Sequence, residues 1–254
     1  MILYPNVKLN LGLNVLRKRP DGFHDLETLF IPYGGICDRL EITGSDEFGI
    51  SIEREGGVDW DPQQDLTAKA YRLLKEDFGI GPVKIRLVKN APVGAGLGGG
   101  SSDAVAALKI CNVLFGLRLD DDALEDYARK LGSDCAFFVR NEPCIGEGRG
   151  DRMTPYDIDL DGYEIKVAVP AGVSVSTAEA YRGVRFHEGI SLREALSRPV
   201  REWRDCLGND FERTIFAAHP EIAALKRRFY DEGAVYAAMS GSGSAVFALF
   251  EKEF

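Results

Sequence analysis

The segment with the clearest chemical meaning is VGAGLGGGSSDA, residues 93–104, in which five glycines fall within seven residues. A strand is predicted before it, over residues 83–90, and an alanine-rich helix is predicted to open at Ser101 or Ser102. A glycine-rich loop between a strand and a helix presents free backbone N–H groups and the positive end of a helix dipole, which together bind phosphate. The sequence therefore predicts a phosphate site, with a glycine turn that binds nothing as the alternative.

Two common phosphate loops fit this segment less well. Gly94, Gly96 and Gly99 satisfy the dinucleotide pattern G-x-G-x-x-G, but that fold also needs a second strand ending in an acidic residue about 20 positions on. The acidic residues 120–122 are predicted to begin a helix instead. No lysine stands between the glycines and Ser101, which excludes the Walker A loop, and the protein-kinase motif HRD does not occur. A nucleotide site of another class remains.

The amino-acid composition and charge of the chain exclude several classes of function. The chain has 254 residues, 45% of them hydrophobic, and a net charge of −9 without a basic block, so no nucleic-acid partner is expected. No apolar run approaches the roughly 20 residues of a membrane span, and no secretory signal is expected at the N-terminus. The five cysteines form no CxxC pair and the three histidines are scattered, so neither zinc nor disulfides are expected, which fits a cytoplasmic protein.

The elements predicted along the chain mix strands and helices without regular alternation, which favours the α+β class. Apolar residues alternate strictly over residues 6–15, which predicts a strand with Lys8 and Asn10 on its polar face. A hairpin is predicted over residues 40–55, a strand at CAFFV (135–139), and helices over 65–79 and 120–132, the second with Asp120 as its cap. Two strands, 234–239 and 245–250, are predicted to form a pair around a Ser-Gly loop. A border near residue 150 divides the chain into parts of residues 1–150 and 151–254.

With these elements in place, PVGAGLGGGSSDA (92–104) resembles the phosphate motif of the GHMP kinase superfamily, whose members phosphorylate small metabolites. Further motifs resemble one branch of that superfamily and follow its order from residue 5 to residue 247. They are PNVKLNLGLNVLRKRPDGFHDLETLF (5–30), LGSDCAFFV (131–139), VSTAEAY (175–181), GNDFE (208–212) and MSGSGSAVF (239–247).

The resemblance implies ATP-dependent phosphorylation of an alcohol on a small molecule that carries a cytidine diphosphate, in the non-mevalonate isoprenoid pathway. Mg²⁺ accompanies ATP in such a reaction. The implied fold has an N-terminal part similar to the second domain of ribosomal protein S5 and a ferredoxin-like C-terminal part, with the active cleft between them. A monomer or weak homodimer is expected, with neither a membrane nor a nucleic acid as partner.

The resemblance also assigns roles to residues. Asp134 is expected to accept the proton of the reacting hydroxyl, and Lys8 to balance charge on the transferring phosphoryl group. By their types alone, Lys8 belongs to a solvated strand face, Asp134 to a turn or helix cap, and Lys89 to a strand end in water. The implied ATP-binding residues are Lys89, Pro92, Val93, Gly94, Ala95, Gly96, Leu97, Gly98, Gly99, Gly100, Ser101 and Ser102.

The remaining implied residues concern the acceptor. Asn10, Phe23, His24 and Tyr181 are expected to bind it, with aromatic rings stacking on a cytosine. Phe23 stands where the family usually has tyrosine, so it can stack but cannot hydrogen-bond. Ser240, Gly241, Ser242 and Gly243 are expected to line the cleft, although they could form a hairpin turn only. No metal-ligating residue is assigned. A nicotinamide-dependent reductase and a nucleotide-binding protein without catalysis are the alternative functions.

Overall fold

The computed structural model describes residues 1–252, which form two compact units, each considered by itself. The first unit comprises Met1–Lys8, Pro32–Val93 and Gly98–Glu142. The second comprises Leu9–Ile31, Gly94–Leu97 and the chain from Pro143 onward. The units therefore interleave along the sequence. The predicted domain border at residue 150 stays a prediction, because each unit combines three separate stretches of the chain and the units are not divided at a single residue.

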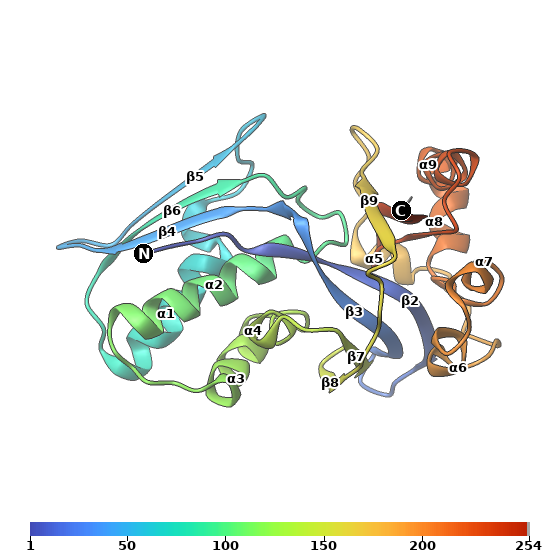
Figure 1. The fold of residues 1–254 in the computed structure, drawn as a ribbon. Coiled ribbons are helices and arrows are strands. Elements are labelled where there is room, and N and C mark those ends of the chain that lie inside the picture. Colours follow the sequence, from blue (N-terminus) through green and yellow to red (C-terminus); the bar gives the residue numbers. More distant parts are fainter. Residues whose placement is uncertain (253–254) are drawn as a thin grey trace. The chain divides into compact units, whose positions relative to one another are not determined.

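The first unit is a four-stranded sheet with helices on one face (Figure 1). The strand order is β1 (Ile2–Leu3), β4 (Arg39–Gly44), β6 (Val83–Lys89) and β5 (Gly49–Arg54). β6 buries alternate residues against α1 (Leu66–Phe78) and α2 (Gly99–Leu114), because successive side chains of a strand point to opposite faces. The unit is completed by η1 (Pro62–Gln64), α3 (Asp121–Leu131) and α4 (Phe137–Arg140).

Two predictions for this unit are wrong. β4 and β5 do not form a hairpin, because β6 lies between them, antiparallel to β4 and parallel to β5. CAFFV is a helical turn rather than a strand: α4 begins within it, and Phe137, Phe138 and Val139 are all buried. A short continuous apolar run fits a buried helix as well as a buried strand, so its pattern cannot separate the two.

The second unit contains two antiparallel sheets. One has the order β2 (Asn6–Lys18), β3 (His24–Cys37), β7 (Cys144–Gly148) and β8 (Arg152–Pro155), and the first residues of β2 and the last of β3 belong to the first unit. The other has the order β10 (Tyr236–Met239), β11 (Val246–Glu251) and β9 (Tyr163–Ala168), which confirms the predicted terminal strand pair.

Short helices accompany these sheets. They are α5 (Thr177–Tyr181), α6 (Leu192–Leu196), η2 (Val200–Glu202), α7 (Trp203–Cys206), α8 (Glu212–Ala218) and α9 (Pro220–Asp231). Ile215 of α8 and Ile222 of α9 share one apolar core with Met239 and Val246 of the neighbouring strands. Across residues 1–252, no helix combines the length and the apolar character that crossing a membrane requires. The mixture of strands and helices confirms the predicted α+β class.

Helix caps offer a test of the local structure. The side chain of Asp120 accepts a hydrogen bond from the backbone N of Ala123 at the start of α3, as predicted. Replacing an N-cap aspartate by alanine costs about 1 kcal/mol, so Asp120→Ala should lower the thermal transition measurably. The matched variant Asp122→Ala removes only an exposed ion pair with Arg140, which is worth about 0–1 kcal/mol. Equal losses for the two variants in thermal denaturation would contradict the assigned cap.

Candidate active site

The glycine loop leads into a helix that has no side-chain cap. α2 begins at Gly99, two residues earlier than predicted, with Gly98 as its N-cap. None of the side chains described in residues 1–252 caps this helix, so Ser101 and Ser102 are not caps. The first N–H groups of a helix have no partner within it, and glycines leave them accessible. The start of α2 is therefore a set of backbone donors suited to an anion.

Several of the glycines are required by the protein itself. A Cβ on Gly96 would lie 2.1 Å from the carbonyl oxygen of Ser240. At Gly98 (φ +70°) a Cβ would lie 3.1 Å from carbons of Lys8 and of Phe138, and at Gly99 it would lie 3.0 Å from Ala91 Cβ. Close packing therefore explains these three glycines without any ligand.

Gly94 and Gly100 differ from the other three. A Cβ on Gly100 would meet only Leu66 Cδ1, at an ordinary 3.7 Å, and one on Gly94 would meet only Ser174 Oγ at 3.9 Å. Gly94 has φ +69°, which favours glycine in any case. Gly100 has no such reason, since it lies in a helix where alanine is more stable. Neither packing within the protein nor backbone conformation therefore explains Gly100.

The structure brings the two predicted catalytic residues together. Lys8 Nζ lies 3.3 Å from Asp134 Oδ2, and the side chains are 3% and 32% exposed. Lys8 is carried by β2, while Asp134 stands in the turn between α3 and α4, where Ser133 Oγ donates to its other oxygen. Lys8 also packs against Gly98, the N-cap of α2. A buried ammonium, a carboxylate open to solvent and a helix start thus share one unit.

Lys89 is engaged within the protein. Its ammonium donates to Asp103 Oδ2 at 2.6 Å and to Asp38 Oδ2, and all three side chains are almost fully buried. Burial alone lowers the pKa of Lys89, but the charges of Asp103 and Asp38 raise it above its usual value. Burial raises the pKa of Asp103 well above its usual range, against the opposing charge of Lys89. Lys89 is therefore a buried cation with two carboxyl partners.

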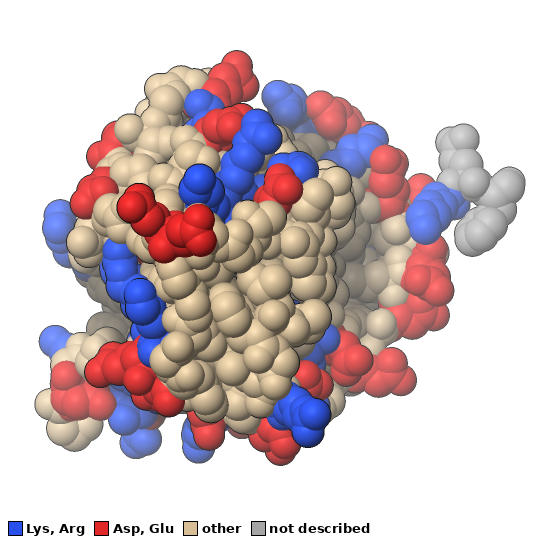
Figure 2. Space-filling view, turned by 90° about the vertical axis from the view of Figure 1, so that its left-hand side faces the viewer, with Lys and Arg blue, Asp and Glu red and all other residues tan. Residues whose placement is uncertain are grey.

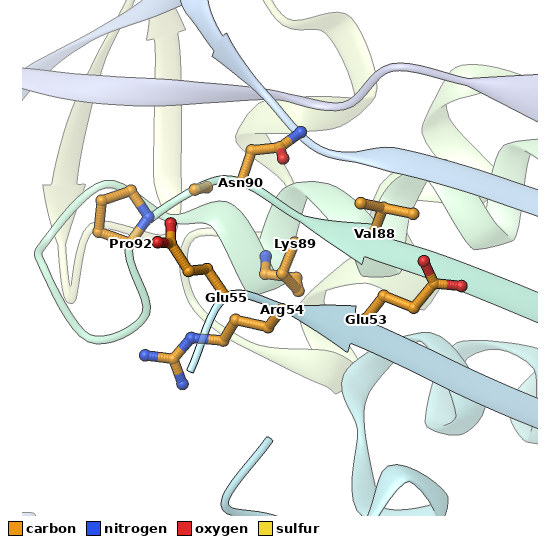
Figure 3. Close-up of a pocket in the computed structure, with 8 residues that line it drawn as sticks. Glu53, Arg54, Glu55, Val88, Lys89, Asn90 and Pro92 are labelled. Carbon is orange, nitrogen blue, oxygen red and sulfur yellow. The ribbon is translucent and has the colours of Figure 1, made fainter. Parts of the chain in front are cut away.

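A pocket of about 550 Å³ lies beside this cluster, at the ends of β5 and β6. Its two sides come from different strands: residues 53–55 extend from β5 and residues 88–92 from β6 (Figure 3). Pro92, predicted as an ATP-binding residue, is one of its walls. The chain that forms this wall continues directly into the glycine loop. The pocket was not predicted, because its sides are adjacent only in the folded sheet.

On the face shown in Figure 2, lysines and arginines are interspersed with acidic residues around a broad area without charged side chains. Within residues 1–252, no three His, Cys, Asp or Glu side chains are placed to hold a metal ion. An anionic ligand would be bound by local donors such as those at the start of α2.

In the second unit, two of the residues predicted to bind the substrate alcohol, His24 and Tyr181, lie in one aromatic cluster. The rings of His24 and Tyr181 stack with centroids 4.5 Å apart and planes 18° apart, and Phe186 is tilted against His24 at 6.4 Å. Burial, helped by the charge of Lys18, lowers the pKa of His24, which favours the neutral imidazole. The Phe23 ring is 54% exposed, with the Arg149 guanidinium 5.0 Å from its centre.

Asn10 and the Ser240–Gly243 loop meet around buried hydrogen bonds. Asn10 Nδ2 donates to Thr28 Oγ1 at 3.0 Å, and the Asn10 backbone N donates to Ser240 Oγ at 3.2 Å. Ser240 Oγ in turn donates to Gly96 O at 3.0 Å. Asn209 fixes this loop, since its Nδ2 donates to Met239 O and Gly241 O, both at 2.8 Å. The loop is therefore more than a hairpin turn: it packs on the middle of the glycine loop.

Three buried residues were missed as contributors to the site. Asp38 and Asp103 hold Lys89, and Asn209 holds the Ser240 loop. Asp103 follows the glycine motif directly, so its place could have been noticed. Asp38 carries no motif, and its role depends on tertiary contact with residues about fifty positions away.

Family models match the chain in two places. The model for the GHMP kinases N terminal domain matches residues 65–142, and the model for the GHMP kinases C terminal domain matches residues 191–254. A protein of Bacteroides fragilis named 4-diphosphocytidyl-2-C-methyl-D-erythritol kinase is 48% identical over 257 residues, which covers 100% of this chain and 93% of that protein. A protein of Cytophaga hutchinsonii with the same name is 44% identical and covers 98% of this chain and 92% of its own.

Solved structures agree with these relatives. The crystal structure of a 4-(cytidine 5'-diphospho)-2C-methyl-D-erythritol kinase matches with a TM-score of 0.82 and 33% identity, covering 98% of this chain and 90% of that one. A homoserine kinase from Cytophaga hutchinsonii matches with a TM-score of 0.68 at 20% identity, covering 98% of this chain and 86% of its own, a likeness of fold.

The two helical glycines provide a matched pair of variants. Gly99→Ala places a methyl group against Ala91 and should destabilise the protein by about 1–3 kcal/mol through overpacking. Gly100→Ala meets only an ordinary contact and should be neutral or stabilising by up to about 1 kcal/mol. Thermal and urea denaturation of both variants measures the difference. A Gly100→Ala variant as unstable as Gly99→Ala would show that internal packing explains both glycines.

Proposed function

Because the chain belongs to the family of 4-diphosphocytidyl-2-C-methyl-D-erythritol kinases, we propose that it transfers the γ-phosphoryl group of ATP to the 2-hydroxyl of that family's substrate, giving the 2-phosphate and ADP. The chain is a small-molecule kinase with the GHMP kinase fold, as the sequence resemblance predicted. The observation that carries the assignment of residues is the pairing of Lys8 with Asp134 in the unit that also contains the start of α2.

We assign the nucleotide to the first unit. The bare N-terminus of α2 offers N–H donors to the phosphates, and Gly100 has the open space such a ligand needs. The pocket beside residues 88–92 is large enough for a base and has walls of both polar and apolar residues. Lys89 is not assigned to the phosphates, because its ammonium is occupied by Asp38 and Asp103.

The chemistry we propose divides between two side chains. Asp134 accepts the proton of the acceptor hydroxyl as its oxygen attacks the γ-phosphorus, and the bond to the β,γ-bridging oxygen breaks to release ADP. Phosphoryl transfer has a loose transition state. The positions of the reacting groups and the stabilisation of charge on the phosphoryl group therefore matter more than early removal of the proton from the attacking hydroxyl. Lys8, buried and fixed beside Asp134, supplies a positive charge that needs no reorganisation during the step.

The side chains around the start of α2 are compatible with a magnesium ion that is bound mainly by the phosphates of ATP. Asp38 and Asp103 are ion-paired with Lys89 and almost fully buried, whereas the Asp134 side chain is 32% exposed and belongs to the same unit as the start of α2. Mg²⁺ commonly takes one or two carboxylates and keeps several waters, and Ser101 and Ser102 offer hydroxyl groups at the helix start. When bound, the ion neutralises charge on the β- and γ-phosphates.

We assign the cytidine end of the acceptor to the aromatic cluster of the second unit. His24 and Tyr181 stand in direct contact at 4.5 Å, so a cytosine stacks on an outer face of the pair and not between the rings. The neutral His24 has one ring nitrogen that donates and one that accepts, which suits the polar edge of a base. A monomer or weak homodimer and a cytoplasmic location stay predictions.

One assay tests the reaction. Wild-type protein with ATP and Mg²⁺ should release ADP when given the cytidine-diphosphate alcohol, and should not do so with mevalonate or homoserine. ATP binding without turnover would favour the non-catalytic nucleotide binder. Competition of NADH with ATP for binding would favour the reductase.

Asp134→Asn keeps the size of the side chain and removes the base. A positioned general base contributes about 10²–10⁴-fold, so kcat should fall by that amount while both KM values stay within a few-fold. Lys8→Ala should lower kcat as severely, and the double variant should be little worse than either, since the two act as a unit. Asp121→Asn, an exposed aspartate of α3, is the control. A near-normal single-turnover rate in folded Asp134→Asn would remove the aspartate from the mechanism.

Tyr181→Ala removes one ring of the proposed base site. Stacking on an aromatic side chain is worth about 1–3 kcal/mol per base, so KM for the cytidine substrate should rise accordingly, with KM for ATP unchanged. Tyr181→Phe keeps the ring and should behave like the wild type. Tyr156→Ala, in the same unit but outside the cluster, controls for the loss of a tyrosine. If Tyr181→Ala weakens ATP instead, the two ligands have been assigned to the wrong units.

A further inference from the structure

The buried cluster of Asp38, Lys89 and Asp103 connects the β6 side of the pocket with the start of α2 and with the segment between β3 and β4. Asp38 stands between β3 and β4, Lys89 ends β6, and Asp103 lies in α2. Lys89 Nζ donates to both carboxylates. The other oxygen of Asp38 accepts the backbone N–H groups of Asn90 at 2.6 Å and Ala91 at 2.7 Å. These two residues form part of the pocket wall.

The same cluster fixes the helix against that wall. Gly99, the first residue of α2, approaches so closely that a Cβ there would lie 3.0 Å from Ala91 Cβ and 3.4 Å from Lys89 Nζ. Four residues later, Asp103 reaches back to the same ammonium. The Lys89 ammonium thus fixes the position of the start of α2 relative to the pocket wall at residues 89–91. Both belong to the first unit.

Stability alone does not account for such a cluster. Burying charges costs several kcal/mol each, and apolar replacements of buried ion pairs are often neutral or stabilising. The cost is visible at Asp103, whose Oδ1 is buried and has no hydrogen-bond partner within residues 1–252. The stability of the fold therefore does not explain why Lys89 has Asp103 as a second carboxylate partner besides Asp38.

We propose that Asp38, Lys89 and Asp103 are positioning residues for the nucleoside triphosphate. They hold the pocket wall and the start of α2 at one fixed separation, so that the base and the phosphates of one ATP molecule meet their partners together. Lys89 acts through this link and does not touch the phosphates. The inference rests on the proposed assignment of ATP to the first unit, and its test measures ATP binding separately from turnover.

The decisive variant is Asp103→Leu, which removes the tie from α2 to Lys89 and leaves Lys89 paired one to one with Asp38. Asp103→Asn keeps an oxygen acceptor for Lys89 and is the conservative rescue. Ile42→Val, a fully buried position of β4 in the same unit, controls for general loss of stability. Each purified protein is titrated with ATP and Mg²⁺ by calorimetry without acceptor, and its thermal transition, kcat and both KM values are measured.

We expect folded Asp103→Leu to bind ATP about tenfold or more weakly, since losing one well-placed hydrogen bond to a charged group changes affinity by about this factor. KM for ATP should rise in parallel, with KM for the acceptor unchanged, and Asp103→Asn should stay near wild type. ATP affinity within twofold of wild type in folded Asp103→Leu would overturn the proposal. So would an equal loss of ATP affinity in Ile42→Val.

A second variant keeps the test decisive if Asp103→Leu does not fold. The double variant Lys89→Met, Asp103→Leu removes the ammonium with one carboxylate and leaves Asp38 with its two backbone donors. It should show the same loss of ATP affinity, and unchanged affinity would again overturn the proposal. A wild type that binds ATP but phosphorylates no acceptor would refute the proposed function and leave this comparison valid. A wild type that binds no ATP would refute both.

Discussion

The site depends on the close contact between one helix start and its surroundings. α2 begins with glycines that are closely packed: Lys8 and Phe138 lie against Gly98 and Ala91 lies against Gly99, so a Cβ at either position would be 3.0–3.1 Å from its neighbours, tighter than most Cβ contacts. With no side chain there, the backbone N–H groups stay uncovered, and the same packing seats Lys8 beside them. One packing arrangement thus places three groups in the same unit. They are the backbone N–H donors at the start of α2, the Lys8 ammonium, and Asp134, which is paired with Lys8.

This arrangement changes the meaning of the glycine-rich motif. A loop that cradles phosphate is usually explained by the ligand's approach, yet three of these five glycines are explained by protein atoms. Gly96 makes room for the Ser240 loop, which Asn209 holds from behind. The motif therefore specifies how several segments of the chain pack, and the proposed phosphate site uses the backbone that this packing exposes.

The sequence predicted what depends on local pattern and missed what depends on contacts distant in the chain. The strand over residues 6–15 and the cap at Asp120 have physical causes within a few residues, and both predictions were confirmed. The expected solvated face of that strand was wrong, because Lys8, Asn10 and Asn14 are at most 3% exposed. The hairpin over residues 40–55 was wrong because strand pairing is decided by β6, which begins only at Val83 and lies between β4 and β5 in the sheet. Lys8 and Asp134 could be named from the resemblance, whereas Asp38 has no motif and is recognisable only from its hydrogen bonds.

The pocket at the ends of β5 and β6 has a consequence for how such an enzyme can change. Its two sides are neighbouring parallel strands, but the chain needs α1 to pass from one to the other. Residues 53–55 touch the pocket without belonging to the segment that continues into the glycine loop. With the base in this pocket, as proposed, substitutions on the β5 side can alter which base is preferred while the backbone of the glycine loop stays intact. Nucleotide preference is in this sense a separable trait, open to drift or to engineering without rebuilding the phosphoryl-transfer site.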